Sequence, residues 1–161
     1  MIIIVMGVVG AGKTTIGNLL ADELGWRFAD ADDFHPASNV EKIRHGIPLS
    51  DADRQPWLKR LRVEISAWVA KAENTVLACS ALKRSYRDQL QTGPEVRFVY
   101  LKASAELIEN RLRSRRGHFA NDQILASQFA DLEEPKQAVT VDVSATPVQI
   151  VSEIRRQLRL K

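Results

Sequence analysis

The stretch Gly7-Val-Val-Gly-Ala-Gly-Lys-Thr14 decides the fold. It matches the pattern GxxxxGK followed by Ser or Thr, and it lies between the apolar run 2–5 and a helical pattern over 13–24. Glycines let successive backbone N–H groups turn toward phosphate oxygens, and the positive end of the following helix favours the same anions. The sequence therefore predicts a phosphate-binding P-loop between a buried first strand and the first helix.

The residues of this loop predict how a nucleotide would be held. Lys13 would neutralise the β and γ oxygens of ATP, and the hydroxyl of Thr14 would ligate Mg²⁺. The predicted nucleotide-binding residues of the loop are Gly7, Gly10, Ala11, Gly12, Lys13, Thr14 and Thr15. By itself the loop indicates only binding of a nucleotide with Mg²⁺, because GTPases, motor ATPases and regulatory switches share it.

Short apolar runs alternate with helical patterns along the rest of the chain. The runs predict strands over 2–5, 26–29, 75–79, 96–101 and 138–143. The patterns predict helices over 13–24, 52–72, 81–90, 105–115 and 147–160. Ser50 with Asp53 resembles a capping box, and Pro147 after Thr146 suits a first helical turn. We therefore predict a three-layer α/β fold with a parallel five-stranded sheet and helices on both faces.

One domain accounts for the whole chain, 1–161, because 161 residues with 45% hydrophobic content can build a single core. Two polar segments interrupt the alternation, over 30–47 and 113–135. Long insertions in a compact domain are usually binding flaps or lids, or else disordered. We predict a substrate-binding insertion over about 33–58 and a mobile lid over about 113–135.

Composition and charge restrict the class of partner. The net charge of +3 comes from 23 basic residues interleaved with 20 acidic ones, and the basic run 111–116 lacks the aromatic residues that stack on bases, so we expect no nucleic acid. The apolar run 1–9 is shorter than the roughly 20 residues that span a bilayer, so we expect no membrane. A single cysteine, Cys79, fits a cytoplasmic location.

Three carboxylates follow the second predicted strand at its carboxyl end, where ligands bind in open α/β sheets. If the strand persists that far, Asp30 and Asp32 point to the same side. We assign Asp32 as the base that accepts the proton of an attacking hydroxyl and Asp30 as the carboxylate on the metal side. Asp33 is a rival for either role. The alternative is that this cluster only caps a helix or makes a turn.

These motifs, together with further stretches, resemble the gluconate kinase family, the small P-loop gluconokinases related in fold to shikimate kinase. The matching stretches run in family order at 30–36, 46–51, 53–57, 79–87, 98–101, 117–119, 127–129 and 132–135. The resemblance implies transfer of the γ-phosphate of ATP to the 6-hydroxyl of D-gluconate, giving 6-phosphogluconate and ADP. It also implies a homodimer.

D-gluconate carries one carboxylate and a row of hydroxyls, so its pocket needs a cation and several polar groups. The candidates in the matching stretches are Asp32, His35, Asn39, Lys42, Arg54, Arg84 and Arg87. The arginines would bind the carboxylate or the phosphoryl group, and His35, Asn39 and Lys42 would read hydroxyls. The alternatives are solvated or ion-paired arginines on helix surfaces and a turn role for His35.

The run 111–118 resembles the start of the family's lid. Cations around the moving charge and exclusion of water supply most of the catalysis in phosphoryl transfer. We expect Arg115 or Arg116 to reach the phosphates, Arg116 as a catalytic residue and Arg115 on the nucleotide, because Gly117 offers a hinge. The two earlier arginines, at 111 and 113, would stay on the helix surface. The alternative is a solvated basic face.

Two rival functions remain open at this stage. One is a sibling kinase that acts on another small metabolite, such as shikimate or a nucleoside monophosphate. The other is a regulatory module that binds a nucleotide and transfers nothing. The stretches 34–36 and 53–57 argue against the first rival, and the complete set of acceptor-side residues argues against the second.

Overall fold

The computed structural model describes residues 1–114 and 121–161. Its five strands form one sheet in the order β2-β3-β1-β4-β5, and every neighbouring pair is parallel. The strands are β1 (Ile2–Met6), β2 (Arg27–Asp30), β3 (Thr75–Ala78), β4 (Val96–Lys102) and β5 (Val139–Asp142). The predicted strands are all present, and the sheet confirms the predicted α/β fold.

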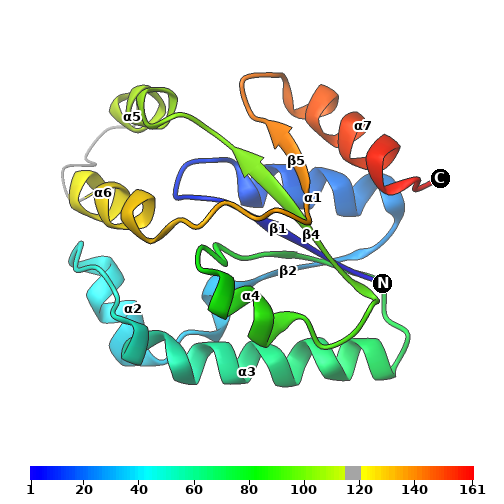
Figure 1. Ribbon diagram of the computed structural model, residues 1–161, viewed down its shortest axis with the longest axis horizontal. Helices are drawn as coiled ribbons and strands as arrows, with labels where there is room; N and C mark the ends of the chain where they lie inside the picture. The colour runs from blue at the N-terminus through cyan, green and yellow to red at the C-terminus, as the bar shows by residue number, and fades with distance from the viewer. Residues whose placement is uncertain (115–120) are drawn as a thin grey trace.

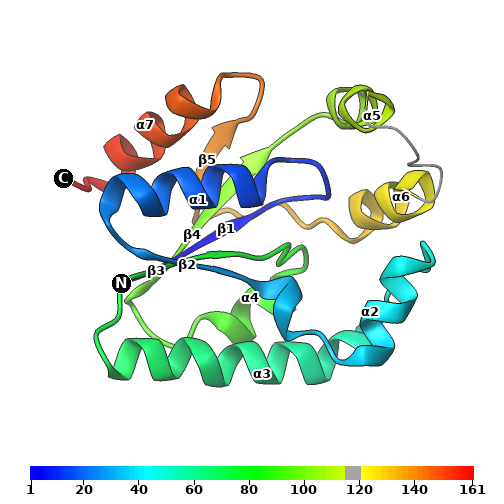
Figure 2. The ribbon, with the colours of Figure 1, turned by 180° about the vertical axis from the view of Figure 1, so that it is seen from behind.

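Helices cover both faces of this sheet and complete the three layers (Figure 1). The helices of the described residues are α1 (Lys13–Leu24), the 3₁₀ helix η1 (Ala31–Phe34), α2 (Ala37–Arg44), α3 (Asp51–Ala70), α4 (Arg84–Leu90), α5 (Ala105–Arg113), α6 (Asn121–Asp131) and α7 (Pro147–Leu158). Helices α1 and α7 lie on one face, and α3 and α4 lie on the other (Figure 2). Within 1–114 and 121–161, no helix has the length and apolar character needed to cross a bilayer.

The central strand β1 shows why the sheet is covered twice. Ile3 and Val5 point into a core shared with α1, α5 and α7, whereas Ile2, Ile4 and Met6 point into a core shared with α3 and α4. All five side chains are fully buried. A continuous apolar run is what a strand between two helical layers needs, and it places the loop that follows at the middle of the sheet edge.

Two capping boxes fix the starts of α3 and α7. The first was predicted, whereas for α7 the sequence indicated only that Pro147 after Thr146 suits the first turn. The Ser50 hydroxyl accepts from the Asp53 backbone N–H at 3.1 Å, and the Asp53 carboxylate accepts from the Ser50 N–H at 2.9 Å. Thr146 and Gln149 make the same reciprocal pair at the start of α7. Each pair satisfies two N–H groups that a helix leaves without a partner at its start.

The two polar segments are more regular than expected. The segment after β2 contains η1 and α2, and the segment after α5 contains α6. Helix α4 begins at Arg84 and not at residue 81, because Ala81 has a φ of 44°, a left-handed conformation that a right-handed helix cannot include. Helix α5 ends at Arg113, two residues before the predicted end.

Candidate active site

Two adjoining cavities lie at the carboxyl ends of the central strands. The P-loop cavity has a volume of about 210 Å³ and is lined by loop residues, Asp30 and Asp32. The His35 cavity, also of about 210 Å³, is lined by His35 and Arg54 among others. The residues that line both are Val9, Lys13, Asp32 and Ser80. Molecules bound in the two cavities would therefore meet at Lys13 and Asp32.

The P-loop has the backbone conformation that a phosphate site requires. Gly10 and Gly12 have φ values of 79° and 97°, in the left-handed region that favours glycine. Gly12 begins α1 without a side-chain cap, so the first N–H groups of the helix remain available to an anion. A Cβ added to Gly10 would lie 3.3 Å from Ile108, so α5 packs closely against the loop.

Lys13 is the cation of the shared wall. Its Nζ donates to the Val8 carbonyl at 3.0 Å, inside the loop. Desolvation by the surrounding protein lowers the pKa of the amine, and the charges of Asp32 and Asp30 oppose this shift. A poorly hydrated cation interacts strongly with phosphate charge, because little water screens the attraction.

Asp30 ends β2 and caps the short helix η1. Its carboxylate accepts from the Asp32 backbone N–H at 2.9 Å and from the Thr14 hydroxyl at 3.2 Å. The strand does not persist to Asp32, so the expected alternation along a strand does not apply. The turn of η1 instead places both carboxylates in the P-loop cavity. Asp30 therefore has the capping role that was the alternative reading of the cluster, and it also faces the cavity.

Asp32 is the carboxylate of the shared wall. Its side chain is 81% exposed. Desolvation by the surrounding cleft and the negative charges of Asp30 and Asp33 raise the pKa of Asp32, whereas the positive charge of Lys13 opposes this rise. A raised pKa favours proton acceptance in a reaction. Asp33 lines neither cavity.

His35 is held rigidly beside Asp32. Its ring stacks on Trp57 with centroids 4.4 Å apart and an interplanar angle of 12°, and its side chain is 5% exposed. Its Nδ1 lies 3.2 Å from Asn39 Nδ2, and its Nε2 lies 3.9 Å from Asp32 Oδ1. Burial, together with the positive charge of Arg54, lowers the pKa of His35 from 6.5 to about 4. The imidazole is therefore neutral at neutral pH.

We expect this buried imidazole to make folding stability sensitive to mild acid. Since the pKa of His35 falls from 6.5 in the unfolded chain to about 4 in the folded chain, its contribution is complete above 6.5 and is lost as the pH falls to 4. The loss should reach about 3 kcal/mol of unfolding free energy. Urea unfolding of wild type and His35→Gln across this range measures it.

The difference in stability between the two proteins should shrink over that window. The pKa of Asp53 is lowered to about 2, so this carboxylate titrates at lower pH and does not interfere. Two parallel stability curves from neutral pH to pH 4 would contradict the prediction.

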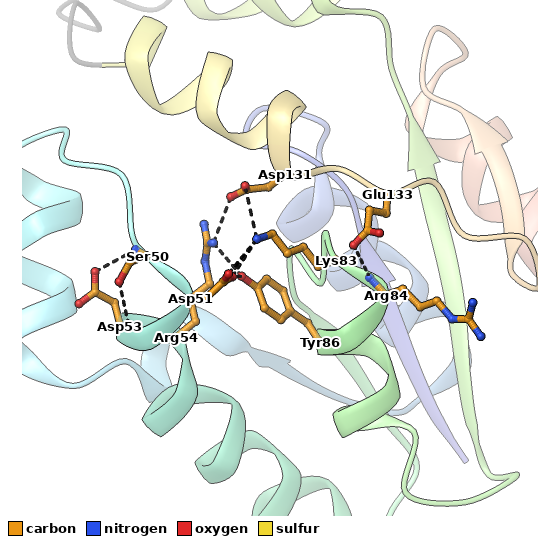
Figure 3. A network of polar contacts seen from close by, with 9 residues as sticks. All are labelled: Ser50, Asp51, Asp53, Arg54, Lys83, Arg84, Tyr86, Asp131 and Glu133. Atoms are coloured by element: carbon orange, nitrogen blue, oxygen red, sulfur yellow. Dashed lines mark hydrogen bonds and ion pairs between the residues drawn. The ribbon is translucent and has the colours of Figure 1, made fainter.

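Arg54 is a fixed cation that lines the His35 cavity. Figure 3 shows its polar contacts with Tyr86 and Asp131. Its Nη1 donates to the Tyr86 hydroxyl at 3.0 Å and to Asp131 at 3.1 Å, and the residue is 8% exposed. The Tyr86 hydroxyl in turn donates to Asp51, which also accepts from Lys83 at 2.9 Å. This network joins the start of α3 to the end of α6 and holds the guanidinium in place.

Helix α6 adds residues that were not among the predicted site residues. Ile124, Ser127 and Gln128 line the His35 cavity. The side-chain oxygen of Gln128 accepts from the Val9 backbone N–H at 2.5 Å, so the helix bonds directly to the P-loop. In the sequence, these residues of α6 lie within the predicted lid over about 113–135, and the stretch 127–129 resembles the gluconate kinase family.

Four predicted substrate residues line neither cavity, namely Asn39, Lys42, Arg84 and Arg87. Lys42 donates to both oxygens of Asp53 and so fastens α2 to α3. Arg87 donates to carbonyls of the β3–α4 loop and to the carbonyl of Glu133, a structural role. The side chain of Arg84 is 82% exposed. Arg84 and Arg87 line a separate cavity of about 510 Å³.

The arginines of the expected lid have different outcomes. Arg111 does not stay on the helix surface, because it donates to the carbonyls of Val143 at 2.7 Å and of Gly10 at 3.4 Å. It therefore braces the P-loop from α5. Arg113 is exposed, as expected. Arg115 and Arg116 lie outside the described residues, so their roles stay predictions.

The oxygen atoms of Thr14 and Asp30 fit the chemistry of Mg²⁺. Both are hard donors, they lie 3.2 Å apart, and both residues line the P-loop cavity. The described residues contain no cluster of three or more His, Cys, Asp or Glu side chains able to hold a metal alone. The donor set therefore suits an ion that is shared with nucleotide phosphates, the usual situation of Mg²⁺.

The chain is similar to known kinases over nearly its whole length. The sequence profile of the family described as shikimate kinase matches residues 9–159. A probable gluconokinase from Xenopus tropicalis is 43% identical over 180 residues, covering 100% of this chain and 95% of that protein. A sugar kinase structure from Janibacter sp. HTCC2649 has a TM-score of 0.91 at 42% identity, covering 99% and 94% of the two chains. A gluconokinase structure from Sinorhizobium meliloti 1021 has a TM-score of 0.87 at 39% identity, covering 98% and 90%. The chain therefore belongs to the gluconokinase family of P-loop kinases, which shares its fold with shikimate kinase.

Proposed function

We propose that the protein is a gluconokinase, an ATP-dependent carbohydrate kinase that transfers the γ-phosphate of ATP to the 6-hydroxyl of D-gluconate. The products are 6-phospho-D-gluconate and ADP. The observation that supports this most strongly is the wall of Lys13 and Asp32 between the two cavities. It would place a cation and a proton acceptor where a phosphoryl group and a hydroxyl meet.

The P-loop cavity would hold the phosphates of ATP. The backbone N–H groups that open α1 would donate to phosphate oxygens, and Lys13 would balance their charge. Thr14 and Asp30 would hold Mg²⁺, directly or through water. When bound, the ion neutralises charge on the β and γ oxygens.

The His35 cavity would hold D-gluconate. Arg54 would pair with its carboxylate, because a guanidinium forms strong bidentate bonds with carboxylates and this one is fixed by Tyr86 and Asp131. The 6-hydroxyl would face Asp32. If the carboxylate of gluconate binds Arg54, the extended molecule places its opposite end near Asp32. This favours phosphorylation of the 6-hydroxyl, which is farthest from the carboxylate.

The transfer would proceed as one displacement. The 6-oxygen forms a bond to the γ-phosphorus, the bond between that phosphorus and the bridging oxygen breaks, and ADP leaves with the electron pair. Asp32 accepts the hydroxyl proton and later releases it to solvent. Lys13 stabilises the charge that moves between the two oxygens.

Three further features remain part of the proposal. Arg115 and Arg116 would complete the positive surroundings of the phosphates from the lid. The homodimer and the cytoplasmic location follow from the family resemblance and from the single cysteine.

A substrate panel tests the proposed function. With MgATP, we expect kcat/KM for D-gluconate to exceed that for shikimate, glucose or AMP by at least about 100-fold, because a polar site rejects molecules that leave its groups unpaired. Release of ADP, measured by a coupled assay, gives the rates. A preference for shikimate or AMP would point to a sibling kinase. Tight binding of ATP without acceptor-dependent release of ADP would point to a regulatory module.

A further inference from the structure

Asn39 is a buried polar side chain that lines neither of the two cavities. It lies in the first turn of α2 and is 2% exposed. Its Nδ2 lies 2.8 Å from the Asp53 carbonyl oxygen and 3.2 Å from His35 Nδ1. A buried amide with two partners in the protein is positioned to orient a neighbour, whereas the sequence had suggested that it reads substrate hydroxyls.

The chemistry of these two contacts fixes the proton on His35. A carbonyl oxygen only accepts hydrogen bonds, so the Asn39 atom that faces Asp53 must be the amide NH₂ group. The same NH₂ group faces His35 Nδ1, and because it only donates, Nδ1 must accept with its lone pair. A neutral imidazole carries one N–H, which is then on Nε2.

The ring has little freedom to escape this arrangement. Trp57 stacks on its face at 4.4 Å, and the Trp57 indole N–H is itself anchored on the Ala31 carbonyl at 2.7 Å. The charged groups around the ring are Asp32 on the Nε2 side and Arg54 in the cavity wall. A second proton, on Nδ1, would point at the Asn39 NH₂ group, in agreement with the lowered pKa of about 4.

We infer that Asn39 is a positioning residue that holds His35 in the Nε2–H tautomer, so that His35 presents a hydrogen-bond donor to the acceptor hydroxyl beside Asp32. The second half of this inference rests on the proposed function. A hydroxyl that accepts from His35 and donates to Asp32 has its proton directed at the base and a lone pair free for phosphorus. Helix α3 positions both His35 and Asn39, because it supplies Trp57, which stacks on the His35 ring, and the Asp53 carbonyl, which accepts from Asn39.

Nitrogen NMR of the wild-type protein tests the tautomer without any measurement of activity. The chain has three histidines, and the signals of His35 are those missing from the spectrum of His35→Gln. At neutral pH we expect a protonated Nε2 and an unprotonated Nδ1. The reverse pattern, or an even mixture of both tautomers, would overturn the inference whether or not gluconate is the substrate.

Two pairs of variants test the consequence for the reaction. Asn39→Asp keeps the shape but replaces the donor by an acceptor, so His35 should move its proton to Nδ1 or become doubly protonated. We expect kcat/KM for gluconate to fall about 10- to 100-fold while KM for ATP changes less than about twofold. Asn39→Ala removes the hydrogen-bond donor without putting an acceptor in its place. In this variant kcat/KM for gluconate should fall less, and His35 should show both tautomers.

The second pair replaces the ring. Glutamine places its amide NH₂ near the position of Nε2, whereas asparagine is too short to reach it, so His35→Gln should retain more gluconate activity than His35→Asn. This pair decides the question if Asn39→Asp does not fold. Equal activity in the pair, or a changed tautomer in Asn39→Asp with unchanged gluconate kinetics, would overturn the role in substrate binding.

Discussion

Replacing Asp32 with Asn will lower kcat for gluconate phosphorylation by about 100- to 10,000-fold, the usual contribution of a general base. The amide has nearly the same shape but cannot accept the hydroxyl proton. Because the side chain is 81% exposed, the free energy of unfolding should stay within about 0.5 kcal/mol of the wild-type value. Steady-state kinetics and urea unfolding of the same preparation measure the two quantities.

Asp33→Asn is the matched control for this variant. It removes the same charge from the next residue, which lines neither cavity, so kcat should stay close to the wild-type value. Near-normal turnover in Asp32→Asn together with a large loss in Asp33→Asn would move the base role to Asp33. Near-normal turnover in both would leave the proton to water.

Replacing Lys13 with Met will lower kcat by at least about 100-fold, the scale of losing one electrostatic contact to the reacting group. The stability of the folded protein should not decrease. Desolvation already lowers the pKa of the Lys13 amine, so the folded protein holds this charge at a cost, and methionine fills a similar volume without it. We therefore expect a midpoint of thermal unfolding equal to or above that of wild type.

This combination of lost activity and retained stability separates a chemical role from a structural one. The Lys13 amine also donates to the Val8 carbonyl, a bond that methionine cannot make. If that bond held the loop in shape, Lys13→Met would unfold at a lower temperature than the wild-type protein. Arg111→Met, which removes a brace of the same loop, is the comparison for a structural loss.

The layers of the fold were predictable because their signals are local. The apolar run of β1, the capping box of Ser50 and the P-loop glycines each act over a few residues. The start of α4 was missed because Ala81 adopts a left-handed conformation that its own side chain does not call for. Only its tertiary setting explains that choice.

Residues of the site were predictable where a sequence motif contains them. They were less predictable where the direction of a side chain on its helix decides which groups it contacts. Lys13, Asp32, His35 and Arg54 line the two cavities, but Arg87 turns inward to backbone carbonyls and Lys42 turns to Asp53. The bond between Gln128 and Val9 joins residues 119 positions apart. No periodicity along the chain reports a contact of that kind.

The shared wall has a consequence for how such an enzyme can change its substrate over time. The nucleotide side is built by the P-loop and the strand ends, whereas much of the other side is built by 35–57 and by α6. Mutations in these later segments can reshape acceptor preference while Lys13 and Asp32 stay in place. Acceptor specificity can thus change during evolution while ATP binding is retained. One ancestral fold can in this way give rise to kinases that phosphorylate different metabolites.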